Sequence, residues 1–73
     1  MDKFNIDKFK INWIERDRNN DEITSVSGFE YQIDSWLRDY ISASGPDFKI
    51  KKNAKLLNSD GTQTIIFIKS KRK

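Results

Sequence analysis

One segment in the middle of the chain has the apolar spacing of a helix, and the segments on both sides have the spacing of strands. Its apolar residues recur every three or four positions: Phe29, Ile33, Trp36, Leu37, Tyr40 and Ile41. Ser27 and Glu30 have the spacing of a capping box at its start, and Gly45 followed by Pro46 stops it. We therefore predict one helix over residues 28–42.

A pair of strands is predicted on each side of this helix. Residues 8–17 and 22–26 flank a polar turn, and residues 48–56 and 62–70 flank a second turn that ends in glycine. The order β-β-α-β-β most simply forms an antiparallel sheet with the helix packed across one face. The predicted fold class is therefore α+β, and the order of the strands in the sheet is left open.

The chain is short, and packing alone must hold its core together. Its 73 residues include no cysteine and no histidine, so that neither a disulfide nor a soft-metal site can stabilise it. Five Phe, two Trp and two Tyr supply large apolar side chains. We expect a single domain over residues 1–73, with a flexible segment at 1–7 and a basic tail at 70–73.

Alternation within the strands assigns their side chains to two faces. The core face of the first strand is expected to carry Phe9, Ile11 and Trp13. The core face of the third strand is expected to carry Phe48, Ile50, Ala54 and Leu56. The outer face of the third strand then carries Lys49, Lys51 and Lys55. Lys52 interrupts this alternation, which indicates a bulge or a sheet edge.

The residue types argue against catalysis. Without His or Cys, the triads and dyads of most hydrolases are excluded, and the carboxylates near the first turn are typical of a solvated loop. Residues 17–28 match a calcium loop poorly, because Glu22 and Gly28 stand where such a loop needs glycine and glutamate. We expect no catalytic residue, no metal and no cofactor. No run is long enough to span a membrane, and the lack of cysteine favours the cytoplasm.

Positive charge is concentrated at the end of the chain. Residues 47–73 carry eight basic and two acidic side chains. The basic set is the candidate binding surface, with an acidic protein surface or a nucleic acid as its partner: Lys49, Lys51, Lys52, Lys55, Lys69, Lys71, Arg72 and Lys73. Seven of the eight are lysines, which disfavours bidentate recognition of bases or phosphates, and no strand aromatic is expected beside them as a stacking platform. A purely solubilising role is the competing explanation.

A weaker candidate surface lies on the helix. Tyr31, Asp34 and Arg38 fall opposite its apolar stripe, and Asp34 and Arg38 have the i,i+4 spacing of an ion pair. An exposed tyrosine among charges can anchor an interface. A hydrophobic staple with Val26 would instead turn the Tyr31 ring toward the core, and we favour that interpretation.

These features favour a small binding module. The main hypothesis is a protein-binding regulator or inhibitor that covers an acidic or nucleic-acid-associated surface of a larger protein, acting as a monomer or weak homodimer. A content rich in Lys, Ile and Asn is typical of small proteins from AT-rich bacteria and their phages, so a phage-type antagonist of a host nucleic-acid-handling enzyme is included. The alternative is a direct nucleic-acid-binding protein that uses the basic hairpin and tail.

Overall fold

The computed structural model describes residues 8–72 and contains four strands and one helix in this part of the chain. The expected flexibility of residues 1–7 and the position of Lys73 lie outside the described residues. The elements are β1 (Lys10–Arg16), β2 (Glu22–Gly28), α1 (Glu30–Ser44), β3 (Phe48–Leu57) and β4 (Gln63–Lys71). Strand β4 continues to Lys71, so that Ser70 and Lys71 of the segment expected as a basic tail lie in a strand.

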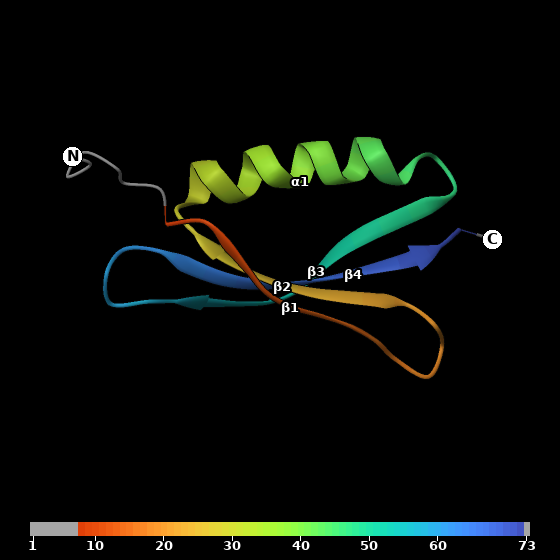
Figure 1. Ribbon diagram of the computed structural model, residues 1–73, viewed down its shortest axis with the longest axis horizontal. Helices are drawn as coiled ribbons and strands as arrows, with labels where there is room; N and C mark the ends of the chain where they lie inside the picture. The colour runs from red at the N-terminus through yellow and green to blue at the C-terminus, as the bar shows by residue number, and fades with distance from the viewer. Residues whose placement is uncertain (1–7, 73) are drawn as a thin grey trace.

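The strands form one antiparallel sheet in the order β1-β2-β4-β3, and α1 lies across one of its faces (Figure 1). This confirms the α+β class and the single helix packed on a sheet. The two hairpins meet in the middle, where β2 pairs with β4, so that β1 and β3 are the edge strands.

The core lies between α1 and the two central strands. Its fully buried apolar side chains come one from the helix and three from the sheet: Ile33, Val26, Ile65 and Phe67. Phe9, Trp36, Leu37 and Ile50 pack around them with part of their surface exposed. The rings of Trp36 and Phe67 have centroids 5.6 Å apart, which joins the middle of the helix to β4. Among residues 8–72, the centre of the core thus consists of four buried apolar side chains.

A bulge in β1 changes the face on which Trp13 lies. Ile11 pairs with Val26 and Trp13 pairs with Ser25, so that Asn12 is the extra residue between two consecutive pairs. Because Val26 faces the helix, Ile11 does too, whereas Trp13 lies with Ser25 on the opposite face. The prediction of Trp13 on the core face is wrong for this reason.

A second bulge has the same effect in β3. Lys52 pairs with Phe67 and Ala54 pairs with Ile66, which leaves Asn53 as the extra residue. Phe48 and Ile50 keep the core face, but Ala54 and Leu56 move to the face away from the helix. Lys55 moves the other way, because it pairs with the buried Ile65, so that the predicted faces of Ala54, Leu56 and Lys55 are wrong.

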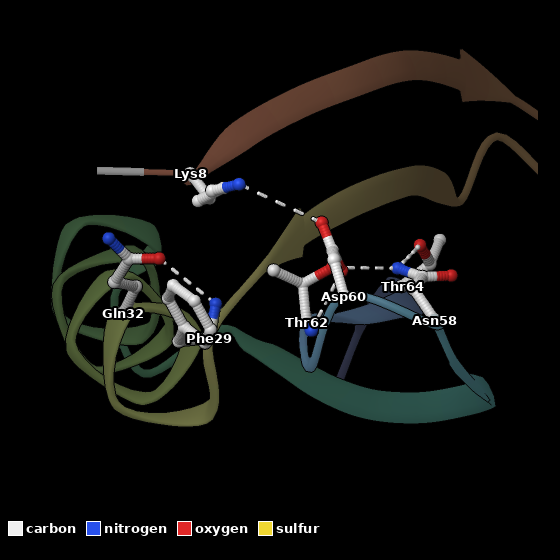
Figure 2. A network of polar contacts seen from close by, with 7 residues as sticks. All are labelled: Lys8, Phe29, Gln32, Asn58, Asp60, Thr62 and Thr64. Atoms are coloured by element: carbon white, nitrogen blue, oxygen red, sulfur yellow. Dashed lines mark hydrogen bonds and ion pairs between the residues drawn. The ribbon is translucent and has the colours of Figure 1, made fainter. Parts of the chain in front are cut away.

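The helix begins two residues later than predicted. The β2 ladder continues through Gly28, which pairs with Gln63, so Ser27 belongs to the strand and not to a capping box. Its hydroxyl lies 2.9 Å from the Thr64 hydroxyl of β4 instead. The side-chain oxygen of Gln32 accepts a hydrogen bond of 2.9 Å from the Phe29 N–H and thereby caps the helix (Figure 2).

The turn between β3 and β4 is held by its own side chains (Figure 2). The Asp60 carboxylate accepts bonds from the N–H and the hydroxyl of Thr62, at 3.0 and 2.6 Å, and these bonds lower the pKa of Asp60. The Asn58 amide donates to the hydroxyls of Thr62 and Thr64 at 3.0 and 3.1 Å. Lys8 approaches Asp60 at 4.0 Å, which brings the start of β1 to this turn.

Gly45 ends α1 in a backbone conformation that only glycine adopts readily, with φ 86° and ψ 177°. A Cβ added there would meet no atom within 4 Å, so the cost of a side chain is conformational and not steric. We expect Gly45→Ala to lower the free energy of unfolding by about 1–3 kcal/mol. D-alanine at the same position, introduced by chemical synthesis, fits this conformation and should leave stability unchanged or raise it by about 0.4–1 kcal/mol. Urea denaturation of both proteins gives the comparison, and equal destabilisation by the two would contradict it.

Candidate binding surfaces

The sheet face opposite the helix carries an apolar centre, and we call it the open face. Its apolar residues come from all four strands: Trp13, Ile23, Ala54, Leu56, Ile66 and Ile68. Trp13 is 41% exposed and Leu56 is 63% exposed, whereas the three isoleucines are partly buried by their neighbours. The two bulges contribute half of this set, because they bring Trp13, Ala54 and Leu56 to this face.

Two neighbouring rows of paired residues cross the open face from β1 to β3. One row has a carboxylate at its β1 end and an ammonium group at its β3 end, and consists of Glu15, Ile23, Ile68 and Lys51. The next row has a large ring at its β1 end and a small side chain at its β3 end, and consists of Trp13, Ser25, Ile66 and Ala54. Both rows are thus asymmetric between their ends.

Strand β3 is an edge of the sheet and carries four exposed lysines, which we call the basic edge: Lys49, Lys51, Lys52 and Lys55. None of the four forms an ion pair with any residue between 8 and 72. Lys49 and Lys51 lie on the side of the open face, whereas Lys52 and Lys55 lie on the side of the helix. The structure therefore distributes the predicted basic residues over both sides of one edge.

The end of β4 extends this basic surface around the corner of the sheet. Arg72 is fixed to the start of β3, since its N–H donates to the Asp47 carbonyl at 2.7 Å and its Nε donates to the Phe48 carbonyl at 3.3 Å. The side chains of Lys71 and Arg72 are exposed and line a shallow hollow together with Lys49. Lys73 lies outside the described residues.

Lys69 does not share this surface. Its Nζ lies 3.5 Å from the Glu22 carboxylate and sits 5.2 and 4.8 Å from the ring centroids of Tyr40 and Phe48. The Tyr40 hydroxyl donates a hydrogen bond to the same carboxylate. Lys69 therefore holds β4 to β2 and the helix, an internal contact that a count of basic residues in the sequence could not reveal.

These contacts shift two pKa values in opposite directions. The pKa of Glu22 is lowered, chiefly by the bond from Tyr40 and further by the positive charge of Lys69. Burial, followed by the bond to Glu22, raises the pKa of Tyr40 to about 12. Both shifts favour the state in which the glutamate is ionised and the phenol is protonated.

The helix surface predicted from the sequence is exposed, and its charged side chains are not joined to each other. Tyr31 is 61% exposed and stacks on Phe29, with ring centroids 6.2 Å apart. The Tyr31 ring therefore lies at the surface and is not turned toward the core, so the predicted staple between Val26 and Tyr31 is wrong. Asp34 and Arg38 are both exposed, and no ion pair joins them within the described residues.

Residues 8–72 contain neither a metal-binding cluster nor a membrane-spanning helix. No cluster of three Asp or Glu side chains there is placed to hold a metal ion. The helix in this range is too short and too polar to cross a membrane. Comparison with known proteins gave no matching family model, no similar curated protein and no similar solved structure.

Proposed function

We propose that the protein is a non-catalytic protein-binding module that docks through its basic edge on an acidic surface of a larger protein and covers it. The observation that supports this most is the exposed ten-residue edge strand β3 with four lysines that lack ion-pair partners among residues 8–72. An edge strand also presents backbone N–H and C=O groups that a strand of another protein can pair with.

The positive charge of the four lysines determines which strands can pair with this edge. Two β3 strands from different copies would bring like charges together, which disfavours pairing between copies. A strand with acidic side chains on both of its faces would place carboxylates near Lys49 and Lys51 on one side and near Lys52 and Lys55 on the other. The partner that fits best is therefore an extended acidic segment at the surface of a larger protein.

The distribution of aromatic residues favours a protein partner over a nucleic acid. Trp13 lies on the open face as Lys51 does, contrary to the expectation that no strand aromatic shares a face with the lysines. It lies on β1, however, three strand spacings or roughly 14 Å from β3. A base stacked on Trp13 would thus not place its own phosphate at the basic edge.

Covering an acidic surface is sufficient for a regulatory role. Acidic surfaces of nucleic-acid-handling enzymes contact basic partners, and a small basic domain that binds there first excludes them by occupying the space. An inhibitor that a phage directs against such a host enzyme is one regulator of this kind. For this role the domain needs only a charge and a shape that are complementary to the partner's surface, and it needs no reactive group.

The proposal predicts loss of binding when the charge of the edge is reversed. The wild-type protein, immobilised and exposed to nuclease-treated bacterial lysate, is expected to retain a discrete acidic protein. The triple variant Lys49→Glu, Lys52→Glu, Lys55→Glu should bind that purified protein about tenfold or more weakly by calorimetry, since three favourable contacts become repulsive. All three positions are exposed, so the fold should tolerate the change.

A second triple variant has the same change in net charge elsewhere on the surface: Lys10→Glu, Arg18→Glu and Arg38→Glu. It is expected to bind within about threefold of wild type, because long-range electrostatics alone are screened at physiological salt. Equal losses in the two variants would show that net charge and not the edge is responsible. Recovery that disappears after nuclease treatment would favour the nucleic-acid alternative.

A further inference from the structure

We propose that the open face binds the open face of a second copy of this chain, forming a symmetric dimer in which two sheets pack face to face. This interface lies on the sheet surface, and it leaves Lys52 and Lys55 of the basic edge outside. Lys51 takes part in both the proposed dimer and the proposed docking, and sedimentation of the purified protein tests the dimer apart from any acidic partner.

The sequence of β4 is that of a strand covered on both faces. Ile65 and Phe67 are buried beneath the helix, and the alternating Ile66 and Ile68 lie on the open face. Antiparallel strands with one face in water normally alternate between apolar and polar residues. The continuous apolar run 65–68 instead indicates that a second layer covers the open face.

Each of the two rows across the open face is complementary to the same row of a second copy that runs in the opposite direction. A two-fold axis parallel to the strands, placed between β2 and β4, lays β1 of one copy over β3 of the other. In the row that runs from Glu15 to Lys51, Glu15 of each copy then lies over Lys51 of the other copy, and Ile23 lies over Ile68. The dimer thus gains two ion pairs and an apolar centre from a single row.

The neighbouring row is complementary in size. The same axis lays the Trp13 ring over Ala54 of the other copy, and Ser25 over Ile66. A large side chain facing a small one is the arrangement by which packed sheets interdigitate at a separation of about 10 Å. Both bulges are required for this match, because they bring Trp13 and Ala54 from the helix side of the sheet to the open face.

The other symmetric arrangement with aligned strands does not match. Turning the second copy end over end would lay β3 on β3 and bring Lys49 and Lys51 of the two copies together. Like charges facing each other in an interface disfavour association. The charges of the open face therefore favour the arrangement with the axis parallel to the strands. Because Glu15 and Lys51 are complementary in that arrangement, a second copy is the partner that fits this face.

A charge exchange tests this arrangement by sedimentation equilibrium across micromolar to millimolar protein. We expect the wild type to form dimers, and Glu15→Lys and Lys51→Glu each to weaken dimerisation about tenfold or more, because each replaces two ion pairs with two repulsive contacts. The double variant Glu15→Lys, Lys51→Glu restores opposite charges and should recover dimerisation to within about threefold of wild type. Both positions are exposed, so the fold is not at risk.

Lys55→Glu is the matched control, because it makes the same change on the same strand but on the side of the helix. It should leave dimerisation unchanged. Ala54→Trp should block dimerisation, since the site opposite Trp13 would be filled. A wild type that stays monomeric over the whole range would overturn the proposal, and so would single variants that dimerise normally or a double variant without recovery. None of these results bears on capture of an acidic protein by Lys52 and Lys55.

Discussion

Replacing Phe67 with alanine is expected to leave most of the protein unfolded at room temperature. Phe67 is 2% exposed and is the largest of the four buried apolar side chains among residues 8–72. It contacts the Trp36 ring, so its loss opens a cavity between β4 and the helix. Truncating a buried phenylalanine costs about 3–5 kcal/mol. A single core of this size supplies about 3–5 kcal/mol of stability in total, so the loss is as large as the whole free energy of unfolding.

Circular dichroism in increasing urea measures this effect. The variant should show little or no folded baseline, whereas Leu57→Ala should stay within about 0.5 kcal/mol of wild type because Leu57 is 70% exposed. Wild type and variants should be compared at one low protein concentration, because association between copies adds to apparent stability. A Phe67→Ala protein that unfolds cooperatively with less than about 1 kcal/mol lost would contradict the assignment of Phe67 to the core.

The sequence predicts the elements well because each one has a local cause. The helical spacing from Phe29 to Ile41, the glycine and proline after it, and the two polar turns all act over a few residues. The structure has the predicted order of strands and helix along the chain, with the helix across one face of the sheet. The strand order in the sheet depends on contacts between distant segments and was not predictable.

The faces of the edge strands were partly mispredicted, because alternation assumes that no residue is inserted. Asn12 and Asn53 are such insertions, and each moves the following side chains to the other face. Two residues in the sequence interrupt the alternation: Ile14 is an apolar residue at a polar position of the first strand, and Lys52 is a charged residue at an apolar position of the third. Neither interruption fixed which residue is extra, since that depends on pairing with β2 and β4.

In the candidate site too, the sequence predicts what depends on neighbouring residues and misses what depends on residues far apart in the chain. The basic composition of residues 47–73 pointed to β3, where the structure finds four exposed lysines along an edge. The role of Lys69 depends on Glu22 and Tyr40, which lie far away in the sequence. An apolar centre on the open face could not be foreseen either, because the bulges create half of it.

The second large effect is expected at Glu22, which joins β2 to the helix and to β4. The carboxylate accepts a hydrogen bond from Tyr40 and pairs with Lys69 at 3.5 Å, with about a fifth of the side-chain surface exposed. Glu22→Gln removes the negative charge and leaves Lys69 without its ion-pair partner. We expect the free energy of unfolding at neutral pH to fall by about 1.5–3 kcal/mol, the range for a hydrogen bond that involves a charged group.

The dependence of stability on pH distinguishes this role from a loss of packing. Because the pKa of Glu22 is lower in the folded protein, its contribution is present above the ordinary glutamate pKa of about 4.3 and is lost as the pH falls through the lowered value. Because the pKa of Tyr40 is raised to about 12, its contribution is present below the ordinary tyrosine pKa of about 10 and is lost as the pH rises toward 12.

Urea denaturation across pH should therefore show a shallower loss of stability in acid for Glu22→Gln than for wild type. Tyr40→Phe should show a shallower loss in alkali. Glu30→Gln is the control, because Glu30 is exposed in the first turn of the helix and should change stability by only a few tenths of a kcal/mol, about the size of a helix-end charge effect. An acid profile of Glu22→Gln parallel to that of wild type would show that the ionised carboxylate does not hold the helix to the sheet.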